Sequence, residues 1–191
     1  MIKGRDIVVL ICLATRDGQN WTIRSLADEL GLAPAGVQRS IKNLLLAGLM
    51  FKSHRYGESP WVARDRAASF LIHAVRPYFP PVFLGDGVRG VAAASDAPPL
   101  RALLTPGDGA QPPLVWPYAL GDQLGTAIQP LHESVPYIAL SHHRPGGAGE
   151  LLALVEAIRY VPNARIQTMA AELIIRQLTA ESDSSHERRS A

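Results

Sequence analysis

The fold of this chain is decided by residues 21–46, which read WTIRSLADELGLAPAGVQRSIKNLLL. The pattern predicts two helices that are joined by a short turn. Gly31 ends the first helix, because glycine turns the chain there without a Cβ penalty. Pro34 begins the second helix, at a position where its missing N–H costs nothing. Apolar residues at helical spacing give each helix a buried stripe, formed by Leu26, Ala27 and Leu30 in the first and by Val37, Ile41, Leu44 and Leu45 in the second.

A hairpin is expected directly after the second helix. Its first arm is residues 48–53, its tip is residues 54–58, and its second arm is residues 60–62. Trp61 alternates with polar neighbours in the second arm, which predicts a place in the core. Residues 21–22 are expected to form a short strand that closes onto this hairpin.

These residues resemble the winged helix-turn-helix transcriptional regulators of the MarR-like kind. The pattern of that family is Leu-Ala-x-x-Leu-Gly-Leu-x-x-x-x-Val-x-x-x-Ile-x-x-Leu, followed by Gly-Leu and a hairpin. The resemblance covers residues 3–75, about two-fifths of the chain. It implies a DNA-binding domain at residues 1–76. The pattern positions are filled in order by Leu26, Ala27, Leu30, Gly31, Leu32, Val37, Ile41 and Leu44.

The polar face of the second helix carries the residues that we expect to contact DNA. Recognition helices lay the N-terminal part of such a face in the major groove. Gln38 and Arg39 are expected on base edges, because glutamine pairs bidentately with adenine and arginine with guanine. Ser40 and Lys42 are expected nearer to phosphates. The alternative is a solvated polar face, as on any surface helix. The face consists of Ala35, Gly36, Gln38, Arg39, Lys42 and Asn43.

Positive charge is concentrated in the same part of the chain. Residues 1–75 hold ten Lys/Arg and six Asp/Glu, whereas residues 76–191 hold nine and eleven. No acid occurs between Leu30 and Gly57, so this segment would attract a phosphate backbone. In the family, the hairpin reaches phosphate or the minor groove. For His54, the alternative is that it is an ordinary exposed loop histidine. The hairpin residues that the resemblance assigns to DNA are Lys52, His54, Arg55 and Tyr56.

A helix over residues 3–16 is expected before this motif. Residues 7–14 are apolar on every side, and a helix without a polar face is buried all round. One side must pack on the helix-turn-helix, and the other needs a cover from the C-terminal part or from another subunit. A dimer contact is the favoured expectation. Cys12, the only cysteine of the chain, is expected to be a buried packing residue.

The middle of the chain is rich in proline. Nine of the fifteen prolines lie in residues 77–117, which excludes long helices there. Residues 85–90 match the G-x-G-x-x-G string, but no βαβ unit surrounds it, so we interpret it as a glycine turn. Residues 114–118 and 125–128 are expected to form a hairpin, and residues 130–140 a short helix. The Trp-Pro strand of this hairpin and a turn at residues 129–131 could form either a small ligand pocket or a docking face.

Catalytic and metal sites are not expected. His132, His142 and His143 have no cysteine or carboxylate at ligand spacing, and Arg144 is adjacent. His73, on a predicted helix over residues 65–75, is expected to be a buried or edge histidine. The chain has no nucleophile elbow, phosphate loop or paired-cysteine motif, so neither an enzyme nor a cofactor is predicted.

The C-terminal part is predicted to contain two helices, over residues 150–161 and 163–178. Pro162 separates them, and Asn163 is a good cap for the second helix. Such a helical hairpin either dimerises or packs on the N-terminal helix. Residues 179–191 are polar and are expected to be a disordered tail.

Together these features predict an α+β chain that is mainly helical. It consists of a winged helix-turn-helix at residues 1–76 and a dimerisation, effector or partner-binding domain at residues 77–178. The longest apolar run is far too short to span a membrane, and no signal peptide is recognised, so a cytoplasmic protein is expected. The predicted function is a homodimeric transcription regulator, a repressor that binds double-stranded DNA at an inverted repeat. The alternatives are an antitoxin-like autoregulator that binds a co-encoded protein, and a regulator that responds to a small-molecule effector.

Overall fold

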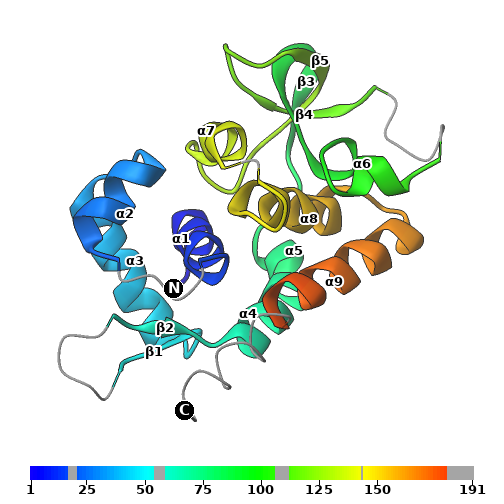
Figure 1. The fold of residues 1–191 in the computed structure, drawn as a ribbon. Coiled ribbons are helices and arrows are strands. Elements are labelled where there is room, and N and C mark those ends of the chain that lie inside the picture. The colour runs from blue at the N-terminus through cyan, green and yellow to red at the C-terminus, as the bar shows by residue number, and fades with distance from the viewer. Residues whose placement is uncertain (17–20, 54–58, 106–111, 143, 180–191) are drawn as a thin grey trace.

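Helices dominate the computed structural model, which describes residues 1–16, 21–53, 59–105, 112–142 and 144–179 (Figure 1). The chain is α+β and mainly helical, with small sheets, as predicted. Its helices are α1 (Gly4–Ala14), α2 (Ile23–Leu30), α3 (Pro34–Leu46), α4 (Arg64–His73), α5 (Val75–Tyr78), the 3₁₀ turn η1 (Ala94–Asp96), α6 (Leu100–Leu103), α7 (Val135–Ser141), α8 (Ala148–Tyr160) and α9 (Ala164–Thr179). Its strands are β1 (Met50–Phe51), β2 (Trp61–Val62), β3 (Phe83–Ala92), β4 (Leu114–Pro117) and β5 (Gln123–Ile128).

Helix α1 lies between the two halves of the chain, with α2 and α3 on one side and α8 on the other (Figure 1). Every residue from Asp6 to Ala14 is buried. The second cover of residues 7–14 therefore comes from the C-terminal part of the same chain. This corrects the expected dimer contact through α1, because α8 already occupies the side that was assigned to another subunit.

The predicted turn between α2 and α3 is confirmed. Thr22 caps α2, with its side-chain oxygen accepting from the Ser25 backbone N–H at 3.0 Å. Gly31 adopts the left-handed conformation, with φ of 62°, and Pro34 is the first residue of α3. Local sequence signals therefore fix the ends of both helices.

The β1–β2 ladder is short and follows α3. Met50 pairs with Val62, and Phe51 pairs with Trp61. The predicted core position of Trp61 is wrong, because this side chain is 52% exposed and contacts Phe51 at a ring-centroid distance of 4.8 Å. Residues 21–22 form no strand, and the Trp21 carbonyl instead accepts a hydrogen bond from the Ser59 hydroxyl at 3.0 Å.

The strands of the middle region form a small closed barrel. The glycine-turn interpretation of residues 85–90 is wrong, because they belong to the long strand β3. The expected hairpin is also wrong, because β4 and β5 are parallel to each other and each is antiparallel to β3. Close backbone packing leaves no room for a side chain at Gly90 or Gly125, since a Cβ on Gly90 would lie 2.2 Å from the Trp116 carbonyl oxygen, and one on Gly125 would lie 2.0 Å from that of Pro113.

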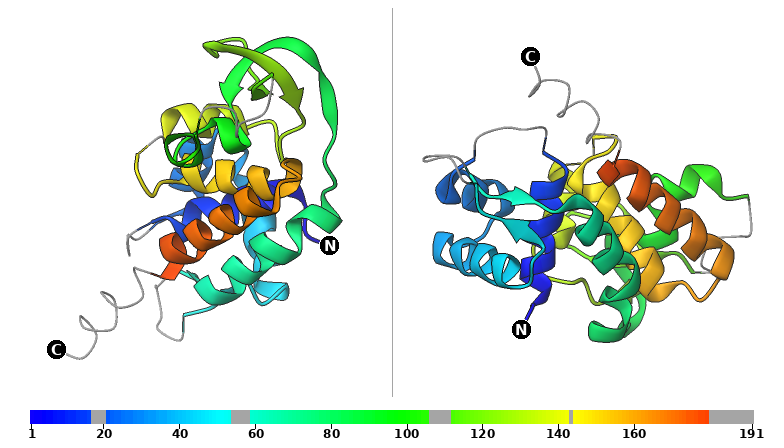
Figure 2. Two further views of the ribbon diagram at one scale, coloured as in Figure 1. Left: turned by 90° about the vertical axis from the view of Figure 1, so that its right-hand side faces the viewer. Right: turned by 90° about the horizontal axis from the view of Figure 1, so that it is seen from below.

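The predicted C-terminal helices are present as α8 and α9. The Asn163 side-chain oxygen accepts from the backbone N–H of Arg165 at 2.9 Å, which confirms the predicted cap. Helix α9 packs alongside α4 and α8 (Figure 2). Buried apolar side chains of α1–α4, the barrel, α8 and α9 belong to one continuous cluster, so residues 1–76 and 77–178 share a core. The predicted tail from residue 180 onward lies outside the described residues.

Candidate nucleic-acid interface

The exposed side of α3 carries the residues that the sequence singled out for base contacts. Ala35, Gln38, Arg39 and Lys42 are all exposed on this helix. Its N-cap, Ala33, provides no side-chain hydrogen bond to the first turn. The positive end of the helix dipole is therefore not screened by a capping side chain, and this favours an anion such as phosphate near that end.

The opposite side of α3 is held by α1. The Ser40 hydroxyl donates to Asp6 Oδ1 at 2.6 Å, and the Asn43 amide donates to Asp6 Oδ2 at 3.0 Å. Ser40 is fully buried, which corrects its expected place near phosphates. Asn43 is half-buried, and its amide is directed to Asp6 and not to solvent. Both side chains therefore anchor the helix to the core.

Arg5 is a basic residue near this surface that the sequence reasoning missed. Its Nε donates to the Ser40 hydroxyl at 3.2 Å. A Cβ on Gly36 would lie 3.1 Å from Arg5 Nη1, so the guanidinium group lies directly beside the first turn of α3. The sequence feature that could have identified Arg5 is the pair of polar residues, Arg5 and Asp6, at the start of an otherwise apolar helix. Gly36 is therefore half-buried beside the Arg5 guanidinium group, and little of its backbone is accessible to DNA.

The β1–β2 ladder extends the basic surface beyond α3. Lys52 is exposed directly after β1. Arg66 of α4 lies 4.9 Å from the centre of the Phe51 ring and donates to the Gly48 carbonyl at 3.3 Å. These contacts fix the base of the hairpin against α4. The predicted tip residues His54, Arg55 and Tyr56 lie outside the described residues.

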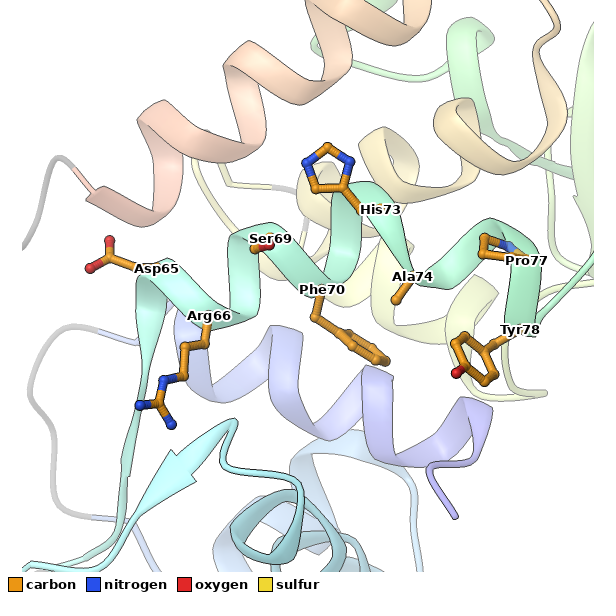
Figure 3. A pocket seen from close by; sticks show the side chains of 8 residues that line it. All are labelled: Asp65, Arg66, Ser69, Phe70, His73, Ala74, Pro77 and Tyr78. Atoms are coloured by element: carbon orange, nitrogen blue, oxygen red, sulfur yellow. The ribbon is translucent and has the colours of Figure 1, made fainter.

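An open groove of about 520 Å³ follows α4 and α5 (Figure 3). Arg66, Phe70 and Tyr78 extend to one side of these helices, whereas His73 extends to the other. His73 is exposed, so of the two expected positions, buried or at an edge, the buried one is wrong. The polar groups of the groove do not converge on one point, so this groove lacks the arrangement of a catalytic site.

The most buried ion pair of the described residues lies far from α3, on α8. Glu156 and Arg159 are fully or almost fully buried and contact each other. Burial raises the pKa of the Glu156 carboxyl to about 7, and Arg159 opposes this shift. Glu156 accepts from the Leu131 N–H at 3.3 Å, and Arg159 Nε donates to the Phe79 carbonyl at 2.9 Å. The pair therefore ties α8 to the two chain segments that flank the barrel.

Among the described residues, no three His, Cys, Asp or Glu side chains gather as metal ligands. In that same part of the chain, no helix has both the length and the apolar character to cross a membrane. No protein-family model, curated protein or solved structure matches this chain. The residues of the α3 surface themselves are therefore the best indication of what this chain binds.

Proposed function

We propose that residues 1–76 form a winged helix-turn-helix domain of the MarR-like kind, and that the chain is a sequence-specific regulator that binds double-stranded DNA. The observation that carries this proposal is the exposed face of α3, where Gln38, Arg39 and Lys42 lie together. No acid occurs in the sequence from Gln38 to Lys52, which lies in the first arm of the hairpin. A surface of this kind offers both base-reading and phosphate-binding groups.

The proposed roles follow from side-chain chemistry. Gln38 and Arg39 read base edges in the major groove, where their bidentate hydrogen bonds distinguish adenine and guanine. Lys42 and Lys52 contact phosphates and make the affinity depend on salt. Arg5 adds a further charge beside the first turn of α3, which has no hydroxyl side chain of its own for phosphate.

The proposed regulator acts as a homodimer and a repressor. Two copies would place their α3 helices in successive major grooves about 34 Å apart and read an inverted repeat. Since α1 is covered within its own chain, the dimer must use another surface. The groove along α4 and α5 is our choice, because Tyr78 is 76% exposed there beside Phe70. A Tyr78→Glu variant that remained a dimer by light scattering would count against this surface.

The test of DNA binding is selection of duplex fragments from the source genome at physiological salt. The wild-type chain is expected to enrich an inverted repeat. An Arg39→Ala/Lys42→Ala variant is expected to lose this enrichment. Arg101→Ala/Arg176→Ala is the matched control, because it removes the same charge from the exposed sides of α6 and α9, away from the proposed dimer surface. Weak, sequence-independent binding by all three chains would contradict a specific regulator.

A second candidate function is supported by the outer surface of the barrel. Phe83, Leu84 and Leu124 are more than half exposed on β3 and β5. A contiguous patch of exposed apolar residues marks a protein-interaction surface. This favours the antitoxin-like alternative, in which the C-terminal part binds a co-encoded protein. Co-purification from the native host of a second chain that Leu124→Lys releases would support it, and recovery of this chain alone would count against it.

A further inference from the structure

A polar cavity of about 210 Å³ lies between the end of α1, helix α2 and the segment that joins α7 to α8. Thr15 and Arg16 line it beside α1, Glu29 lines it from α2, and His142 and Arg144 line it from the joining segment. Sites for drug-sized ligands occupy about 300–1,000 Å³. The size of this cavity therefore suits a smaller molecule.

Arg16 is the central charge of the cavity. Its side chain is only 17% exposed, and its Nη2 contacts the Glu29 carboxylate. Within the described part of the chain, the buried Nε of Arg16 has no hydrogen-bond partner. A buried donor without an acceptor is unfavourable. The contact with Glu29 therefore leaves one donor of the Arg16 guanidinium group without an acceptor.

The cavity holds more positive than negative groups. Arg144 donates from Nη2 to the Thr15 carbonyl at 2.7 Å, and His142 Nδ1 lies 3.7 Å from Glu29 Oε1. The cavity thus holds two guanidinium groups, and the Glu29 carboxylate contacts only that of Arg16. Burial lowers the pKa of His142, and Arg16 and Arg144 lower it further. Burial is the larger cause of this shift, and the two arginines are the smaller one.

We propose that this cavity binds a small oxyanion, a carboxylate or a phosphate group, between Arg16 and Arg144. Guanidinium groups present paired N–H donors that match the oxygens of both anions. The anion accepts from the Arg16 guanidinium group and replaces Glu29 as the counter-charge of this residue. Arg144 closes the site from the other side.

Anion binding in this cavity would affect the proposed DNA-binding surface through α2. The Arg16–Glu29 contact joins α1 to α2, and α2 packs on α3. An anion that takes Arg16 from Glu29 loosens this attachment and changes how α3 is presented. This consequence rests on the proposed function, since it makes the cavity an effector site of a DNA-binding chain.

The experiment is a thermal-shift titration of the full chain without DNA. Sodium phosphate and sodium acetate are compared with sodium chloride at equal ionic strength. We expect one or both anions to raise the melting temperature by several degrees above chloride, because a ligand that binds only the native state stabilises it. A shift with phosphate alone identifies a phosphate ligand, and one with acetate alone identifies a carboxylate ligand.

Three variants decide whether the shift comes from this cavity. Arg144→Gln is expected to abolish it, whereas Arg76→Gln, which removes the same charge from α5, is expected to retain it. Glu29→Gln removes the competing carboxylate and is expected to lower the anion concentration for half of the shift several-fold. This gain keeps the test valid if Arg144→Gln folds poorly.

The inference is overturned if both anions act like chloride, or if Arg144→Gln keeps the full shift. DNA binding is then measured separately, with and without the anion that binds. A chain that binds the anion but no duplex would overturn the proposed function and leave the site. A chain that binds DNA and neither anion would overturn the site alone.

Discussion

The cations of α3 and the cation of α8 have opposite surroundings. Arg39 and Lys42 are exposed to solvent, whereas Arg159 is only 3% exposed and contacts the buried carboxyl group of Glu156. An exposed charge contributes little to folding but is available to a phosphate backbone. A buried charge is unavailable to a large partner, and its loss leaves the opposite charge without compensation. Burial therefore decides whether an arginine of this chain is available to a large partner or is tied to the stability of the fold.

The largest expected effect is on the buried pair. Glu156→Ala leaves Arg159 buried without its counter-charge, so we expect the free energy of unfolding to fall by about 3–5 kcal/mol. Urea denaturation followed by circular dichroism measures this. Glu172→Ala, on the exposed side of α9, is the control and should change stability by less than about 0.5 kcal/mol. Equal stability of the Glu156→Ala and Glu172→Ala variants would contradict the stabilising role of the buried pair.

The next effect is on base recognition. Arg39→Ala should weaken operator binding by ~1–3 kcal/mol and relax the preference at one base position. Its unfolding free energy should stay within about 0.5 kcal/mol of wild type, because the side chain is exposed. Binding to a randomised operator library measures both properties. If affinity and base preference are both unchanged, α3 has been assigned the wrong groove face.

The pH dependence of stability gives a second test of the buried pair on α8. Burial raises the pKa of Glu156 from 4.5 to about 7, so the folded chain keeps a proton that the unfolded chain has lost between these values. The contribution of Glu156 to stability is therefore fully present below pH 4.5 and is lost as the pH rises to about 7. The slope is at most about 1.4 kcal/mol per pH unit, since one proton is involved.

Unfolding free energies at several pH values from 4.5 to 8 measure this effect. The difference between wild type and Glu156→Gln isolates it from the histidines. This matters because burial lowers the pKa values of His132 and His142, and their contributions increase stability with rising pH. A wild-type minus Glu156→Gln difference that is constant with pH would show that the carboxyl group titrates alike in both states.

The smallest expected effect is that of a single phosphate contact. Lys42→Ala should weaken binding about equally for all sequences and reduce the slope of log affinity against log salt by about 1. Fluorescence anisotropy at several salt concentrations measures the slope. A change in base preference, with the slope unaltered, would move Lys42 from phosphate contact to base readout.

The helices around the turn could be predicted because their signals are local. Gly31, Pro34 and Asn163 each act on their own helix end, and each is found in the predicted role. The burial of Ser40 could not be predicted from α3 alone. Its hydrogen-bond partner, Asp6, lies 34 residues earlier in the chain and on another helix.

The barrel shows most clearly why the remaining features could not be predicted. The segments of β4 and β5 look like the arms of a hairpin, yet both pair with β3, and this forces them to be parallel. Such pairing is set by a strand distant in the sequence and leaves no mark in the local pattern. The predicted core position of Trp61 was wrong for a related reason, since a ladder of two residues per strand is too short to bury both of its faces.

The attachment of α3 to Asp6 separates two kinds of residue on one helix. Ser40 and Asn43 hold the helix in place from its inner side, while Gln38 and Arg39 stand on the outer side and take no part in that attachment. Substitutions on the outer side therefore leave the scaffold intact. If α3 reads DNA as we propose, descendants of this chain could acquire new operators by exchanging two side chains, with no compensating change elsewhere in the protein.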